Sequence, residues 1–208
     1  MAYDRLAESV RVTESGIAAD PLRLSRRRRF AAVAYDVHAD IVATWFVRRG
    51  HPVPQHEIHL FIWENGRWQL LGGGGFGDGD DHLSDRPGLD ELGAPLVVQG
   101  SGGVIPPNAP HQGPISGPVG YVILRAASSV MSVVLDRGDS LPVPRHGNLL
   151  VVWRQRAPVT HALDADGACL ASVDLGDTGG LAEALGDLGP SRLAGAGVAG
   201  PAPPGAAP

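Results

Sequence analysis

Hydrophobic and polar residues alternate with a period of two between Phe30 and Val47. The odd positions of this stretch are all apolar, whereas the even positions include acidic residues such as Asp36 and Asp40. This period is typical of a β-strand, in which successive side chains point to opposite faces. The stretch exceeds the usual strand length of about 3–10 residues. We therefore expect it to bend or break near residues 38–40.

A β-hairpin is predicted at Asn65-Gly66, which lies between two apolar runs. Both residues accept the positive φ angles that a two-residue turn requires. In this register Trp63 lies opposite Trp68, in a pair that stabilises the hairpin by up to about 1 kcal/mol. We interpret both tryptophans as core residues, because large aromatic side chains fill sandwich cores. The alternative interpretation is an exposed contact patch for a partner.

Residues 72–118 are rich in Gly, Pro and Asp and are expected to form long loops, with one short strand at 96–99. From Val119 to Val173, short apolar runs alternate with turn residues, and almost no helical period separates them. Strands spaced so closely predict an all-β fold. We expect an antiparallel β-sandwich, immunoglobulin-like or related, of about eight to ten strands.

The two ends of the chain differ from this central region. Apolar residues at helical spacing predict a short helix over residues 2–12. We divide the chain into an N-terminal helix and basic arm (1–29), a sandwich domain (30–176) and a C-terminal part (177–208). That last part is predicted to hold a short helix and then a disordered tail, because it has too few apolar side chains to offset the entropy of ordering.

The composition excludes several kinds of chemistry. All 17 basic residues are arginine, so Schiff-base catalysis and Walker-type phosphate binding are excluded for lack of a lysine. The net charge of −5 disfavours nucleic-acid binding by the molecule as a whole. The single cysteine, Cys169, excludes an internal disulfide. No signal-peptide pattern or membrane-spanning apolar run is present, so we expect a soluble, cytoplasmic protein.

The most specific chemical signal is the stretch GGGGFGDGDDH at residues 72–82. Its glycines match the spacing of a dinucleotide-binding loop, but the aspartates that follow would repel a pyrophosphate, and no helix is predicted there. Carboxylates on a flexible loop suit a divalent cation better. Asp78, Asp80 and His82 could meet His59 if the loop folds back over the hairpin. A solvated acidic loop without any cofactor is the interpretation that we favour.

A second charged feature is the run Arg26, Arg27, Arg28 and Arg29 before the first strand. We interpret it as a solvated basic edge. Weak nucleic-acid binding is the alternative, and it is disfavoured because no aromatic residue is interleaved to stack on bases.

The segments AVAYDVHAD, GRWQLLGGGG, GNLLVVW and VTHALDADG together resemble uncharacterised small β-rich proteins encoded in actinobacterial genomes. The resemblance covers most of residues 30–173 and implies a β-rich fold, but it carries no catalytic residue across. We favour a non-catalytic binding or protein-interaction module with an unidentified protein partner. Exposed sheet edges would also permit a homodimer. The alternative is a metal-dependent or His/Asp hydrolase with its site near His59 and the acidic loop.

Overall fold

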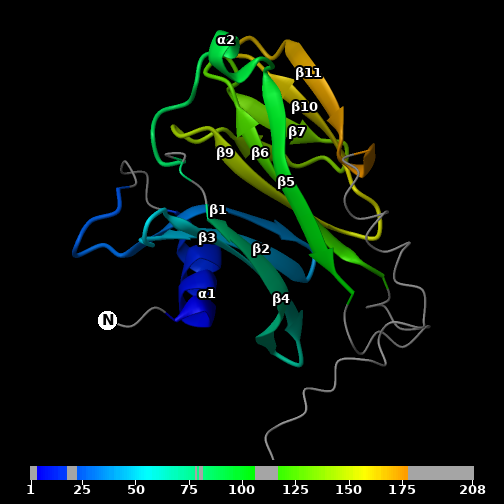
Figure 1. Ribbon diagram of the computed structural model, residues 1–208. Helices are drawn as coiled ribbons and strands as arrows, with labels where there is room; N and C mark the ends of the chain where they lie inside the picture. Colours follow the sequence, from blue (N-terminus) through cyan, green and yellow to red (C-terminus); the bar gives the residue numbers. More distant parts are fainter. Residues whose placement is uncertain (1–3, 18–22, 78, 80–81, 106–116, 178–208) are drawn as a thin grey trace, which may run out of the picture.

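A computed structural model describes residues 4–17, 23–77, 79, 82–105 and 117–177 (Figure 1). The predicted C-terminal helix and tail lie outside these residues. The elements in chain order are α1 (Arg5–Ser15), β1 (Phe30–His38), β2 (Ile41–Arg48), β3 (Gln55–Glu64), β4 (Arg67–Gly77), α2 (Leu89–Leu92), β5 (Leu96–Val104), β6 (Val119–Ala126), β7 (Ser132–Leu135), β8 (Ser140–Pro142), β9 (Asn148–Arg154), β10 (Val159–Leu163), β11 (Cys169–Asp174) and the 3-10 turn η1 (Leu175–Asp177).

The strands form three antiparallel sheets, which confirms the all-β class. The first sheet is the meander β1-β2-β3-β4, the central sheet is β5-β6-β9, and the outer sheet is β11-β10-β7-β8. One hydrophobic core joins the first sheet to the central sheet, and a second core joins the central sheet to the outer one. The antiparallel sheets expected from the sequence are thus packed face to face, and the described residues form three of them.

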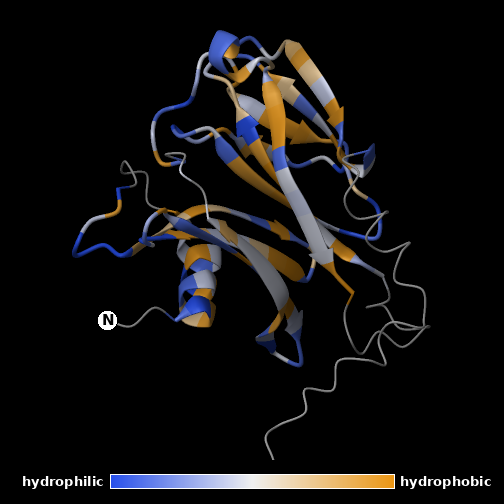
Figure 2. Ribbon diagram, viewed as in Figure 1, coloured by the Kyte–Doolittle hydropathy of each residue, from blue (hydrophilic) through white to orange (hydrophobic). Residues whose placement is uncertain are grey.

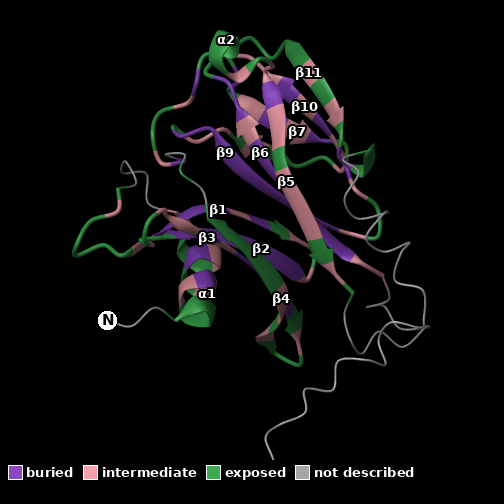
Figure 3. Cartoon of the chain, in the orientation of Figure 1, coloured by how far each residue is buried: buried purple, intermediate pink, exposed green. Residues whose placement is uncertain are grey.

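The third sheet is needed because the central strands are apolar on both faces. Along β6, Tyr121 and Ile123 enter the core shared with the first sheet, while Val122 and Leu124 enter the core shared with the outer sheet. Every residue of β9 except Arg154 is buried. Figure 2 shows the apolar character of these strands and Figure 3 their burial. A strand that is apolar on both faces requires a covering layer on each.

Helix α1 covers the face of the first sheet that points away from the other sheets (Figure 1). The helix begins after Asp4, whose carboxylate accepts hydrogen bonds from two backbone N–H groups of the first turn. Val12 packs against Phe46, and the Ser9 hydroxyl lies 2.8 Å from that of Thr44. The predicted helix is therefore confirmed, although it begins three residues later than expected, and its buried residues are Ser9 and Val12.

The predicted hairpin at Asn65-Gly66 forms, with one difference in register, and the long stretch before it also folds into a hairpin. The first stretch breaks at residues 39–40, as expected, and the two strands that result pair with each other. In the second hairpin Trp63 pairs with Trp68 as predicted, but a bulge lies beyond Phe61. Because Leu71 is the extra residue, His59 pairs with Gly73 and not with Gly72.

The expectation of loops is wrong for residues 72–77, which belong to β4, whereas the strand expected at 96–99 forms and is longer than predicted. Strand β4 continues through its glycines to Gly77, and β5 spans nine residues. The glycines allow close packing, because a Cβ atom on Gly73 would lie 2.1 Å from the Ile58 carbonyl oxygen, and one on Gly72 would lie 2.7 Å from Val104 Cγ1. Because glycine has no side chain, a strand of this kind shows no alternation of apolar and polar residues in the sequence.

Candidate functional site

A cleft of about 770 Å³ lies between β1 and the segment that connects β8 to β9. It therefore sits at the junction of all three sheets. Gly16 and Ile17, after α1, and Leu83 and Asp85 complete its walls. Much of the lining is apolar, and its valine and leucine side chains are Val33, Val37, Leu83, Leu141, Leu149 and Leu150.

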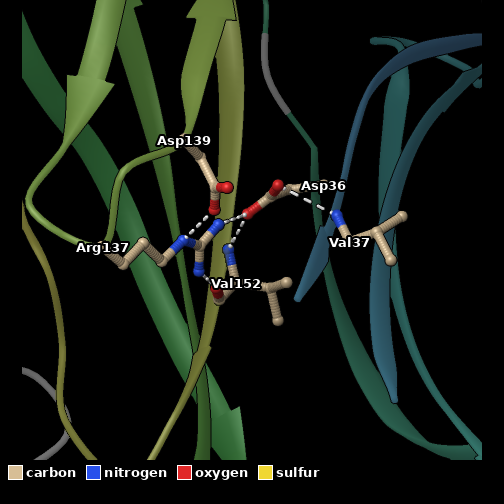
Figure 4. A network of polar contacts seen from close by, with 5 residues as sticks. All are labelled: Asp36, Val37, Arg137, Asp139 and Val152. Carbon is tan, nitrogen blue, oxygen red and sulfur yellow. Dashed lines mark hydrogen bonds and ion pairs between the residues drawn. The ribbon is translucent and has the colours of Figure 1, made fainter. Parts of the chain in front are cut away.

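Asp36, which lines the cleft, forms an ion pair with Arg137 (Figure 4). The Arg137 guanidinium donates to Asp36 Oδ2 at 2.9 Å and to Asp139 Oδ2 at 2.5 Å. Asp36 is 5 % exposed, so burial raises the pKa of its carboxyl group, while the Val152 N–H and Arg137 act in the opposite direction. Both carboxylates are thus occupied by one arginine.

His146 and Asn148 contribute polar groups to the cleft lining. The Asn148 N–H donates to His146 Nδ1 at 3.1 Å, so the proton of the neutral imidazole is assigned to Nε2. Burial, together with the positive charge of Arg125 and Arg86 and the nearby His82, lowers the pKa of His146 to about 4. His146 is therefore a neutral hydrogen-bond donor at pH 7.

The Asn148 side chain is buried and held in one orientation. Its amide nitrogen donates to the carbonyl oxygen of His82 at 2.6 Å and lies 3.4 Å from that of His146. Among the described residues, no donor reaches its Oδ1 atom. A buried acceptor without a donor costs about 1–3 kcal/mol.

Arg145 and Asp85 form an exposed pair that also lines the cleft. Two guanidinium nitrogens donate to the two carboxylate oxygens at 2.6 and 3.0 Å. These hydrogen bonds hold the pKa of Asp85 below its usual value and that of Arg145 above it. Because both side chains are well exposed, this pair can open at little energetic cost.

The structure does not bring His59 and His82 together. His59 pairs with Thr44 on the face covered by α1, and its Nε2 lies 3.4 Å from Glu57 Oε2. His82 lies on the opposite face, with ring contacts to His56 at 4.7 Å and Trp45 at 5.7 Å. The described structure therefore does not bring His59 and His82 into one site.

The acidic members of the predicted metal site, Asp78 and Asp80, lie outside the described residues. Their pairing with either histidine stays a prediction. Within the part of the chain that the structure describes, no three His, Cys, Asp or Glu side chains are placed to hold a metal ion.

A buried aromatic cluster around His56 was not predicted from the sequence. The His56 ring stacks on Phe76 with a centroid distance of 4.6 Å, and its Nδ1 accepts a hydrogen bond from the Trp45 indole at 3.1 Å. The alternation of β3 places His56 on the same face as Ile58 and Leu60, so the period-two pattern could have identified it as inward-facing.

The tryptophan pair lies on the surface. The rings of Trp63 and Trp68 meet edge to face at 5.3 Å, but Trp63 is 48 % exposed. The core interpretation is therefore wrong for Trp63, because α1 packs on β1 and β2 and not on this end of the hairpin. The use of this pair as an interaction surface stays a prediction.

The four arginines at 26–29 are all exposed and lie before β1. The backbone N–H of Arg28 bonds to Ser25 Oγ at 2.9 Å, and its carbonyl oxygen accepts from the Ser25 N–H at 2.8 Å. The run is thus held in a defined turn beside α1.

Comparison of the chain with models of protein families, with curated proteins and with solved structures finds no match. Within the described ranges, no helix has the length and apolar character needed to cross a membrane. The class that the fold and the site define is an all-β protein of three stacked sheets with a cleft at their junction.

Proposed function

We propose that this protein is a non-catalytic binding module that takes a small, largely apolar ligand in the cleft between β1 and the β8–β9 segment. The observation that carries this proposal is the cleft itself, with its volume of about 770 Å³ and its mainly apolar side chains. Ligand sites in proteins typically measure about 300–1,000 Å³ and combine apolar walls with a few fixed polar groups.

The polar groups of the cleft favour binding over catalysis. Asp36 and Asp139 are both held by Arg137, and Asp85 is held by Arg145. A general base must be available with a pKa near the working pH. With a pKa of about 4, His146 is too weak a base for that role near neutral pH.

The same groups indicate what polar feature the ligand carries. The Nε2–H group of His146 can donate to a ligand acceptor. A ligand with one acceptor, such as a carboxamide or a hydroxyl group, would complement it. Most of its remaining surface would be apolar, to match the leucine and valine side chains of the walls.

A titration with the fluorescent probe 1-anilinonaphthalene-8-sulfonate tests the proposal. We expect saturable binding to one site on the folded protein, with enhanced fluorescence in the apolar cleft. Ser140→Trp adds a large side chain at an exposed position of the cleft lining and should abolish this binding. Ser129→Trp makes the same change in an exposed turn outside the described lining and should leave the binding intact.

Two results would count against the proposal. The first is equal probe binding by the Ser140→Trp and Ser129→Trp variants, which would place the probe elsewhere. The second is the lack of saturable binding by the wild-type protein, both of this probe and of a panel of small carboxamides and alcohols followed by thermal shift.

A further inference from the structure

A second pocket, of about 390 Å³, lies between α1 and the start of β1. Helix α1 contributes Glu8 and Arg11 to its lining, and the turn before β1 contributes Arg27, Arg28 and Arg29. Residues 30–32 complete it with one aromatic and two small apolar side chains. This pocket is separate from the cleft described above and shares no lining residue with it.

The charge of this pocket is strongly positive. Four arginines line it against a single carboxylate, that of Glu8, and this carboxylate already pairs with Arg11 at 2.9 Å. No ion pair joins Arg27, Arg28 or Arg29 to any residue in the described ranges. The pocket therefore concentrates positive charge in a protein whose net charge is −5.

The backbone of the arginine turn is fixed at both ends. Two hydrogen bonds join Ser25 to Arg28, and the Arg49 N–H donates to the Arg29 carbonyl oxygen at 2.8 Å. The arginine side chains thus extend from a fixed backbone, so no backbone entropy is lost when they close around a ligand. Their mutual repulsion is relieved when an anion lies between them.

We propose that this pocket binds the phosphate group of a small phosphorylated molecule. A guanidinium presents paired N–H donors that match two phosphate oxygens, so adjacent arginines suit a phosphate better than they suit a monovalent anion. The pocket can hold one such group beside the Phe30 ring. A long nucleic acid would extend beyond the pocket and be repelled by the rest of the protein, whose net charge is negative. A small ligand avoids this repulsion and is therefore favoured.

The test is a calorimetric titration with inorganic phosphate and with pyrophosphate, at constant ionic strength and with chloride as the reference anion. We expect saturable binding, tighter for pyrophosphate. The double variant Arg27→Gln/Arg28→Gln should weaken it at least about tenfold, because it removes charge-assisted hydrogen bonds. The control Arg67→Gln/Arg156→Gln changes the net charge equally at exposed positions outside the pocket and should bind as the wild type does.

Equal weakening in both double variants would overturn the proposal, since it would indicate an effect of net charge alone. Wild-type binding of neither phosphate nor pyrophosphate would also overturn it. If a single-stranded oligonucleotide bound under those conditions with strong salt dependence, the arginine turn would be a nucleic-acid contact instead. Circular dichroism of each variant checks that the fold is retained.

Discussion

The Asp36 carboxylate and the Arg137 guanidinium form an ion pair of 2.9 Å between residues that are 101 positions apart in the chain. Asp36 also accepts the Val152 N–H at 2.8 Å, while Arg137 donates to the Val152 carbonyl oxygen. Val152 lies on β9, at the edge of the central sheet. The pair thus occupies backbone groups that an edge strand would otherwise leave exposed, and it joins all three sheets.

We predict that Arg137→Met lowers the free energy of unfolding by about 3 kcal/mol, because it leaves a buried carboxylate without its counter-charge. Asp36 is 5 % exposed and Arg137 14 %, so solvent can replace little of the lost interaction. Chemical denaturation monitored by circular dichroism measures the change.

Arg145→Met is the control for this experiment. Arg145 also pairs with an aspartate through two hydrogen bonds, but both side chains are 69 % exposed. Stability close to that of the wild type is expected for this variant. Similar losses in both variants would show that burial is not what makes the Asp36 pair important.

Stability should fall as the pH is lowered from about 6.5 to about 4, partly through His146. Its folded-state pKa of about 4 lies below its ordinary value of 6.5, so the unfolded chain binds a proton that the folded protein excludes. The stability that comes from keeping His146 neutral is complete above pH 6.5 and is lost as the pH falls through the folded-state pKa of about 4. The difference between the two pKa values corresponds to about 3 kcal/mol in the free energy of unfolding.

His146→Gln should reduce this pH dependence, since glutamine keeps an acceptor for the Asn148 N–H but does not titrate. The measurement is the midpoint of urea unfolding for both proteins at several pH values between 4 and 7. Parallel curves for the wild type and the variant would contradict the assignment.

Gly73→Ala should destabilise the protein by about 1–3 kcal/mol, the usual cost of forcing extra atoms into a packed position. The added Cβ would lie 2.1 Å from the Ile58 carbonyl oxygen, which is backbone and cannot rotate away. Gly100 on β5 is the matched control, because a Cβ there meets nothing within 4 Å. Gly100→Ala should be neutral or slightly stabilising. Thermal unfolding followed by circular dichroism compares the two, and equal effects would exclude the steric cause.

Much of the fold could be predicted from local patterns in the sequence. The turn at Asn65-Gly66 fixes the pairing of Trp63 with Trp68, because a two-residue loop determines which residues face each other. The period-two alternation between Phe30 and Val47 predicts extended backbone, and this stretch forms two strands. These features depend on neighbours in the chain, so one sequence suffices to predict them.

The cleft and its polar groups depend on contacts between distant segments and could not be predicted. Nothing near Asp36 indicates that Arg137 will neutralise it, and the Arg137-Gly138-Asp139 segment has the composition of an ordinary turn. His59 and His82 lie on opposite faces because of where the chain returns after β4, which the strand pattern does not determine. The glycines of β4 hide a strand because they have no side chains to alternate.

The edge-to-face contact between Trp63 and Trp68 provides the last prediction. Each ring is partly exposed, so the contact contributes mainly through the aromatic pair and less through burial. A double-mutant cycle with Trp63→Ala and Trp68→Ala should give a coupling energy of about 0.5–1.5 kcal/mol from urea unfolding. Because neither residue lines the cleft or the arginine pocket, both variants should bind the fluorescent probe and pyrophosphate as the wild type does. Additive losses of stability would mean that the two rings do not interact in solution, which would leave the turn alone to set the register of the hairpin.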